Sequence, residues 1–179
     1  RYPEFPGEIP AVLWMLDEIG RKSVAIDRLD ASLLDAARDR VKRLVLRDYP
    51  MEARYLKQPE ELVLIRAAAG FADICVARMA TEGGTIISQG GTEVDLLKDA
   101  IGFAHAAMLT QHKAAFAGTP MRVVATVHSG PRGALPHGAV IERRPQKGET
   151  VIIGVGGCLG GYHAESAATF VVAEMSAEQ

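Results

Sequence analysis

The sequence is poor in the residues that mark several large classes of protein. Only two of its 179 residues are cysteines, Cys75 and Cys158, and aromatic residues make up 6% of the chain. Two cysteines so far apart cannot build a disulfide framework or a cysteine-rich zinc site. We therefore expect a reducing compartment, and we assign the protein to the cytoplasm.

An excess of one charge and long apolar runs are also absent. The formal net charge is -2, which gives no reason to expect nucleic acid or an anionic membrane as a partner. No run of 18 apolar residues occurs, so we expect no transmembrane helix. The densest basic cluster, Arg143, Arg144 and Lys147, lies beside Pro145 and Gly148, and we interpret it as a solvated turn.

The first 55 residues have the pattern of a small α/β unit. The apolar spacing and a capping aspartate, Asp30, predict a helix, a strand, a second helix and a second strand, at residues 8–19, 23–27, 31–40 and 41–46. So few elements cannot easily enclose a core of their own. We interpret residues 1–55 as the C-terminal part of a larger α/β N-terminal domain. Both ends of the sequence look cut, because the first residue is not methionine and the last residues follow directly on a strand.

Two long helices are predicted next. Apolar residues at spacings of three and four predict helices at 57–80 and 92–111, and Gly83-Gly84 is expected to end the first of them. Thr92 and Asp95 have the spacing of a capping box at the start of the second. His105 and His112 lie on this second helix and are interpreted as packing or solvent residues.

After Pro120 the sequence pattern becomes typical of β-strands. Strands are expected at 121–130, 150–155 and 162–172, with a turn or bulge over the glycines of 156–161. Those glycines lie between two strands, with no helix start to receive a phosphate, so we reject nucleotide binding. Two helices followed by a curved, mainly antiparallel sheet make an α+β domain.

Four segments carry a family resemblance. They read KQPEELVLIRAAAGFAD, GGTEVDL, HSGPRGALPHG and IIGVGGCLGGYHAESAATFVV, in this order. Together they resemble the pita-bread superfamily of creatinase, prolidase (Xaa-Pro dipeptidase) and aminopeptidase P. The resemblance implies that residues 56–179 form the N-terminal half of a pita-bread catalytic domain. It also implies a homodimer, and a second half of the domain supplied by missing residues or by another chain.

The metal positions of this superfamily are changed in the sequence. The resemblance implies that two aspartates of the fourth segment bind a pair of divalent metals, and the matching positions here are Gly154 and Glu165. Glycine has no side chain to offer, and glutamate is longer by one methylene. We therefore expect no cofactor and no metal pair, and we leave open one loosely held divalent ion at Glu165. Creatinase works on this fold without metal, so the loss is compatible with activity.

Four residues are candidates for contact with a substrate. His137 is assigned as the catalytic acid and base, because the resemblance implies that the matching histidine faces the substrate. We assign His128, His163 and Glu165 as substrate-binding residues. A purely structural role is the alternative for His128. His163 and Glu165 share a strand face by period two, which favours a half-exposed ion pair, with a mononuclear metal site as the alternative.

Three functions remain open at this level. The first is hydrolysis of a C–N bond in a small amide, amidino or dipeptide-like substrate without the usual metal pair. The second is a non-catalytic scaffold or binding protein that keeps the fold. The third is a metal-dependent Xaa-Pro dipeptidase or aminopeptidase whose metals are held by the surviving ligands.

Overall fold

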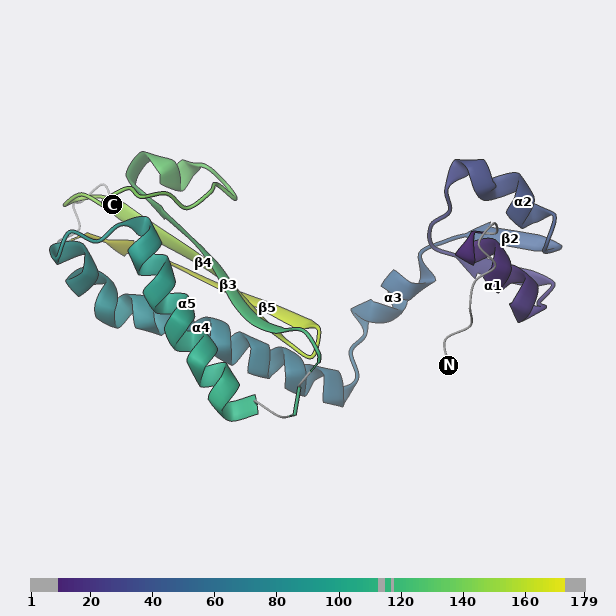
Figure 1. Cartoon of the computed structure of the whole chain (residues 1–179), viewed down its shortest axis with the longest axis horizontal. Helices are drawn as coiled ribbons and strands as arrows, with labels where there is room; N and C mark the ends of the chain where they lie inside the picture. Colours follow the sequence, from purple (N-terminus) through teal and green to yellow (C-terminus); the bar gives the residue numbers. More distant parts are fainter. Residues whose placement is uncertain (1–9, 113–114, 117, 173–179) are drawn as a thin grey trace. The chain divides into compact units, whose positions relative to one another are not determined.

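The chain folds into two compact units. The computed structural model describes residues 10–112, 115–116 and 118–172. The units comprise Arg1–Lys57 and Gln58–Gln179 (Figure 1). Within the described residues, no helix combines the length and the apolar character needed to cross a membrane.

The smaller unit is a parallel two-stranded βαβ arrangement. Its elements are α1 (Ala11–Ile19), β1 (Ser23–Ile26), a 3₁₀ turn (Ala31–Leu33), α2 (Leu34–Arg38), β2 (Arg43–Leu46) and α3 (Tyr49–Tyr55). Strands β1 and β2 pair in parallel, from Ser23 opposite Arg43 to Ile26 opposite Leu46. A small apolar cluster of Leu13, Leu16, Ala37 and Val41 lies in its interior.

The predicted elements of this unit are confirmed except at their ends. Residues 8 and 9 of the first predicted helix lie outside the described residues. The second predicted helix is shorter than expected. The Asp30 carboxylate accepts a hydrogen bond from the Ser32 backbone N–H at 2.8 Å, and the helical segment therefore starts with a 3₁₀ turn. Helix α3 was not predicted. It is capped by Asp48, whose side chain accepts from the Met51 backbone N–H at 3.0 Å.

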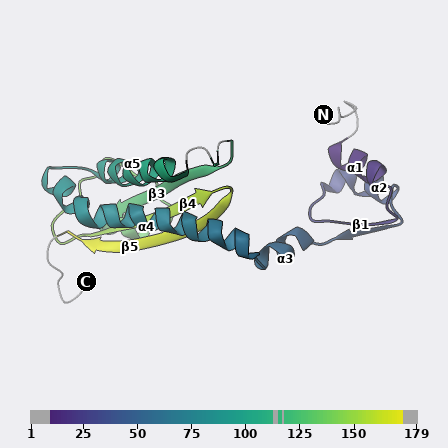
Figure 2. The same cartoon turned by 90° about the horizontal axis from the view of Figure 1, so that it is seen from below.

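The larger unit is a three-stranded antiparallel sheet with two long helices on one face. Its elements are α4 (Pro59–Ser88), α5 (Glu93–His112), β3 (Met121–Ser129), a 3₁₀ turn (Gly130–Ala134), β4 (Thr150–Leu159) and β5 (Tyr162–Val171). The strand order is β3-β4-β5. Helix α4 packs across β4 and β5, and α5 packs against β3 (Figure 2). This is the α+β class expected from the sequence.

The start of α4 is as predicted, but its end is not. Gln58 and Glu61 form a capping box, and the Gln58 N–H donates to the Glu61 carboxylate at 2.7 Å. The helix runs through Gly83-Gly84 to Ser88, so the prediction that these glycines end it is wrong. Gly83 is buried against Met79 and Leu96, where its missing side chain lets α5 approach. The helix ends instead at Ser88, and Gly90, which follows the C-cap residue Gln89, has a left-handed φ of 82°.

The glycines of β4 were also misassigned. The predicted turn or bulge at 156–161 is confined to Gly160 and Gly161, which have φ values of 60° and 85°. Gly156 and Gly157 are regular strand residues, paired with Val124 and Val123 of β3. Glycine occurs within this strand because α4 packs very closely against one face of β4. A Cβ atom on Gly157 would lie 2.1 Å from the Ala68 carbonyl oxygen.

Helix α5 begins as predicted. The Thr92 backbone N–H donates to the Asp95 carboxylate at 2.9 Å, and the Asp95 N–H donates back to the Thr92 hydroxyl at 3.3 Å. These reciprocal bonds confirm the capping box, with aspartate in the place of the usual glutamate or glutamine. The hydrogen bonds that the Asp95 carboxylate accepts from the Thr92 N–H and hydroxyl lower the pKa of this carboxyl.

The last residue of α5 is a polar group in an aromatic setting. The His112 ring meets Phe71 and Phe116 edge to face, with ring centroids 5.5 Å apart in each case. Its Nε2 atom is buried and has no hydrogen-bond partner among the described residues. Burying an unpaired polar nitrogen lowers the free energy of unfolding, and an apolar side chain in the same place would avoid this cost.

We expect His112→Leu to raise the free energy of unfolding by about 1 kcal/mol, because it removes the unpartnered nitrogen and keeps a similar volume. The measurement is urea unfolding at pH 7. The control is His105→Leu on the same helix, which we expect to change stability by less than about 0.5 kcal/mol. A clear loss of stability in His112→Leu would show that the ring has a partner after all.

Candidate functional site

A recess lies on the sheet face opposite α4 and α5. Side chains alternate along a strand, and Ile153 and Val155 of β4 belong to the buried cluster that packs on the helices. Gly154 and Gly156 therefore face the other way. The recess encloses about 420 Å³ and is lined by residues 124–126, 154–156 and 165–167, together with His137.

Glycine forms the floor of this recess. Gly154 pairs with Thr126 on one side and with Ala167 on the other, and Gly156 pairs with Val124 and Glu165. Gly154 and Glu165 are thus diagonal neighbours on the same face, with Cα atoms about 7–8 Å apart in such an arrangement. The space that a side chain at 154 would occupy is open, because a Cβ atom there would meet only the Thr126 hydroxyl, at 3.5 Å.

Glu165 is the acidic group of the recess. Its side chain is exposed, and no described residue donates a hydrogen bond to its carboxylate or forms an ion pair with it. The predicted ion pair with His163 is therefore wrong. The two residues do share a face of β5, but the His163 Nε2 atom lies 3.5 Å from the Cys158 sulfur, on the opposite strand of the hairpin. His163 is not among the residues that line the recess.

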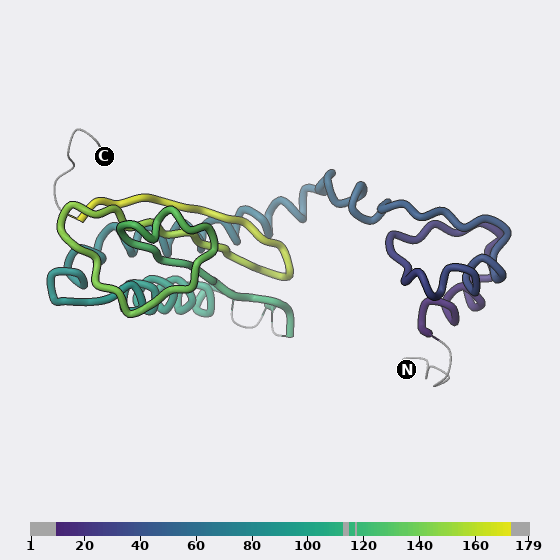
Figure 3. The backbone as a smooth tube through the Cα atoms, turned by 90° about the horizontal axis from the view of Figure 1, so that it is seen from above, coloured from purple at the N-terminus to yellow at the C-terminus, as the bar shows by residue number. Residues whose placement is uncertain are grey.

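His137 enters the recess from the segment 130–149, which joins β3 to β4. This segment reaches over the face opposite the helices, and Figure 3 shows it in green, running over the strands. His137 is exposed and has a φ of 53°, the one positive φ on a residue other than glycine in the described part of the chain. It is the basic side chain among the described residues that line the recess, and Glu165 lines the same recess.

His128 is placed differently from the other candidates. It is buried on β3, and its Nε2 atom lies 2.6 Å from the carbonyl oxygen of Gly138, the residue after His137. The ring thus holds the segment that carries His137 and does not line the recess. The proposed contact between His128 and a substrate stays a prediction.

A buried polar network lies where β3, α5 and the segment 130–149 meet. Its centre is Glu93, which is 0% exposed. The Ser129 backbone N–H and hydroxyl donate to one Glu93 carboxylate oxygen, at 2.8 and 2.7 Å. Arg132 donates to the other oxygen, which also accepts from the Ile141 N–H at 3.4 Å. None of these residues was singled out in the sequence, because Glu93 reads there as an ordinary first-turn acid.

The same network corrects the interpretation of the basic cluster. Arg143 is not a solvated turn residue, since it donates to the Ser129 hydroxyl at 2.7 Å and pairs with Glu149. The hydrogen bonds from Arg143 hold the pKa of the Glu149 carboxyl below its usual range, against the opposing effect of partial burial. Arg144 and Lys147 are exposed, as expected.

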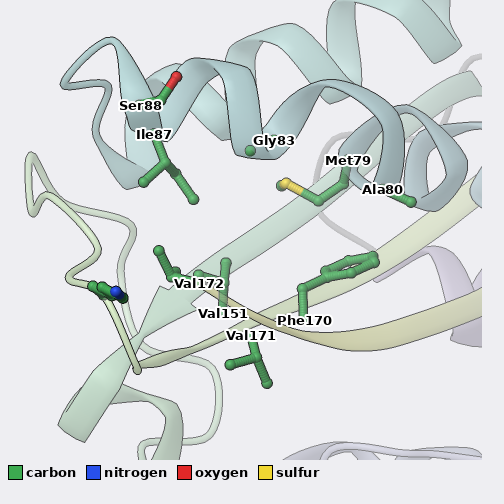
Figure 4. A pocket seen from close by; sticks show the side chains of 11 residues that line it. Met79, Ala80, Gly83, Ile87, Ser88, Val151, Phe170, Val171 and Val172 are labelled. Carbon is green, nitrogen blue, oxygen red and sulfur yellow. The ribbon is translucent and has the colours of Figure 1, made fainter. Parts of the chain in front are cut away.

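A second hollow of about 420 Å³ lies on the helix side of the sheet, near the end of α4. Figure 4 shows Met79 and Ile87 facing Val151, Phe170 and Val172 across it. Lys147 is its charged lining residue, and the described residues that line the hollow include no acid to complete an acid–base pair. We therefore take the recess, and not this apolar hollow, as the candidate site.

A pair of metal ions would need more ligands than the recess offers. Divalent ions such as Mn²⁺ need several oxygen or imidazole ligands at once. Within residues 10–112, 115–116 and 118–172, no three His, Cys, Asp or Glu side chains come together to hold a metal. At the recess, Gly154 supplies no donor atom and Glu165 supplies one carboxylate. The described residues of the recess therefore do not fit a metal pair.

Comparisons with known proteins give one consistent family. Residues 63–179 match the model of metallopeptidase family M24. A probable dipeptidase PepE of Mycobacterium tuberculosis is 31% identical over 123 residues, which cover 68% of this chain and 29% of the relative. The chain thus spans less than a third of that relative's length.

Solved structures show the same fold. A prolidase from Pyrococcus furiosus superimposes with a TM-score of 0.66 and 22% identity, over 89% of this chain and 47% of that one. An X-Pro aminopeptidase from Thermotoga maritima gives a TM-score of 0.65 and 19% identity, over 93% and 45%. The pita-bread fold implied by the sequence is therefore confirmed for the part of the domain that the chain covers.

Proposed function

Because the chain belongs to metallopeptidase family M24, we propose that it is part of a hydrolase acting on a C–N bond. The substrate is a small amide, amidino or dipeptide-like molecule, and the reaction proceeds without the usual metal pair. The observation that carries this proposal is the recess, in which an imidazole and a carboxylate that lacks a described partner line one glycine-floored space.

His137 performs the proton transfers in this proposal. Hydrolysis of a C–N bond requires a water to lose a proton as its oxygen attacks carbon, and the departing nitrogen to gain one. A neutral imidazole can accept the first proton and return it to the leaving nitrogen, since imidazoles exchange protons near neutral pH. The left-handed backbone at His137 and the bond between His128 and the Gly138 carbonyl fix the segment from which this ring projects.

Glu165 binds the substrate in this proposal. Its carboxylate faces the recess without a described partner, so it is available to accept N–H groups of an amine or amidinium. The open floor at Gly154 leaves room for the body of the substrate beside it. A single loosely held divalent ion at Glu165 is the most that these residues suggest for a cofactor. Carboxylates from outside this chain would orient the attacking water.

The apolar hollow and the greater length of the relatives bear on what covers this chain and how it assembles. The solved relatives are about twice as long as this chain. Apolar surface left in water costs about 25 cal/mol per Å². We propose that further polypeptide, from the same or another chain, covers the hollow lined by Met79 and Phe170, and that the protein is a homodimer. We place it in the cytoplasm, where the buried free thiols Cys75 and Cys158 stay reduced.

Two other functions are retained for the test. A non-catalytic binding or scaffold protein is favoured by Gly154, which removes one donor of the metal site. A metal-dependent dipeptidase is favoured by the likeness to a probable dipeptidase.

The test is hydrolysis by the full-length protein of Xaa-Pro dipeptides and N-substituted guanidines, before and after chelation. We expect activity to survive chelation, and His137→Ala to lower kcat/KM by about 100-fold or more. The control is His105→Ala, on α5 behind the sheet, which should keep activity within about twofold. Activity lost on chelation and restored by Mn²⁺ would favour the metal-dependent dipeptidase. A protein that cleaves no member of the panel would favour the scaffold.

A further inference from the structure

The backbone on the C-terminal side of His137 is held by two side chains. The carbonyl oxygen of Gly138 lies 2.6 Å from the His128 Nε2 atom, and the carbonyl oxygen of Ala139 accepts a hydrogen bond from Arg132. Both acceptors are within two residues of His137. The position of the His137 ring therefore depends on the position of the Arg132 guanidinium.

Arg132 is itself fixed by a buried acid. One of its terminal nitrogens donates to the Glu93 carboxylate, and the other donates to Ala139. Its side chain is 19% exposed, against 0% for that of Glu93. A planar guanidinium can satisfy two acceptors in fixed directions, which an ammonium on a flexible stem cannot do.

Glu93 ties together the start and the middle of the connection between β3 and β4. Its carboxylate binds Ser129, where β3 ends, and Ile141, beyond His137. Its own backbone N–H donates to the carbonyl oxygen of Arg143 at 2.8 Å. Because Glu93 lies in the first turn of α5, these parts of the connection are attached to the start of a helix that packs against the sheet.

The segment needs this attachment. Residues 135–149 carry no helix or strand, and Leu135, Pro136 and His137 are exposed, so little apolar packing defines their conformation. A positive φ at a residue with a side chain is uncommon, and persists where its surroundings impose it. The hydrogen bonds to the Gly138 and Ala139 carbonyls are the described contacts that impose it.

We propose that Arg132, held by Glu93, is a positioning residue that sets the backbone at His137 and so aims its imidazole into the recess. The part of this inference that concerns catalysis rests on the proposed function. The part that concerns the backbone does not, and it is measured without a substrate.

The experiment compares full-length wild type with Arg132→Met, Arg132→Lys and Arg144→Met. Arg144 lies in the same segment, and no hydrogen bond of its side chain is formed with the described residues, so its variant is the matched control. The first readout is amide hydrogen exchange of residues 135–141. The second is the split between kcat and KM on the best substrate of the dipeptide and guanidine panel. Thermal unfolding shows whether each variant is folded.

We expect Arg132→Met to speed exchange at 135–141 by about tenfold or more while exchange in α4 and β4 stays unchanged. It should lower kcat by about 10- to 100-fold and change KM by less than about threefold, because a displaced base weakens the chemical step more than binding. Arg132→Lys keeps the positive charge beside Glu93 but loses the planar guanidinium that bonds two acceptors. It should speed exchange and lower kcat by smaller amounts. It also serves if Arg132→Met does not fold.

Unchanged exchange in both Arg132 variants would overturn the inference, whatever the activity. Faster exchange with unchanged kcat would also overturn it, provided that His137→Ala lowers kcat. If His137→Ala has no effect on hydrolysis, the proposed function fails by itself, and the exchange readout alone then decides whether Arg132 sets the backbone at His137.

Discussion

Replacing Gly157 by alanine is expected to lower the free energy of unfolding of the larger unit by about 3 kcal/mol, the upper end of the usual cost of over-packing. The new Cβ atom would lie 2.1 Å from the carbonyl oxygen and 3.0 Å from the carbonyl carbon of Ala68. Both are backbone atoms of α4, so no side-chain rotation can relieve the overlap. The helix must move away from β4, which opens the core around Phe71 and Ala72.

The matched control for this substitution lies three residues earlier on the same strand. Gly154→Ala adds the same methyl group to the recess face, where the nearest heavy atom is the Thr126 hydroxyl at 3.5 Å. We expect its stability to stay within about 0.5 kcal/mol of wild type. Urea unfolding of both variants provides the comparison. Equal stabilities would show that α4 does not approach β4 as closely as described.

Placing aspartate at both positions 154 and 165 should produce the second large effect. We expect Gly154→Asp combined with Glu165→Asp to tighten Mn²⁺ binding by the full-length protein by about 100-fold or more. The native recess offers one carboxylate, whereas the double variant offers two on diagonal positions of one face. There is room for the new side chain at 154, as the distance to Thr126 shows.

Isothermal titration with Mn²⁺ after exhaustive chelation measures this effect. The control combines Gly154→Asn with Glu165→Asp, which has a similar shape but lacks the second charge, and should recover little of the affinity. Two equivalents of metal retained by the native protein after dialysis would contradict our view of the site. A double variant no tighter than its asparagine control would show that charge at 154 is not what the site lacks.

The sequence predicted those features of the fold that depend on local patterns. The stripes at three- and four-residue spacing located α4 and α5, and the Thr92–Asp95 spacing located the start of α5. Glycine was harder to interpret, because it occurs both where a chain turns and where two backbones meet. Gly83 and Gly157 look like breaks in the sequence but lie in regular elements, where their missing side chains allow close packing.

The site was predictable to a different degree in its two parts. Gly154 and Glu165 were recognised from the family resemblance of the fourth segment, and a hairpin with a two-residue turn brings them to neighbouring positions on one face. The network around Glu93 was not recognised, because its partners Ser129 and Ile141 are 36 and 48 residues away. Nothing local distinguishes a buried first-turn glutamate from an exposed one, so such contacts appear only once the chain is folded.

Strand β4 separates two environments with almost no material between them. At Gly156 and Gly157 the partition between the recess and α4 is the peptide backbone alone, since Gly156 adds no side chain on the recess face and Gly157 adds none on the face that meets α4. The Val155 side chain fills the helix side next to them. The depth of the recess is therefore adjustable from behind. We expect a larger side chain at Ala68, which is buried on α4, to push this backbone toward the recess and so to change which molecules the proposed site accepts.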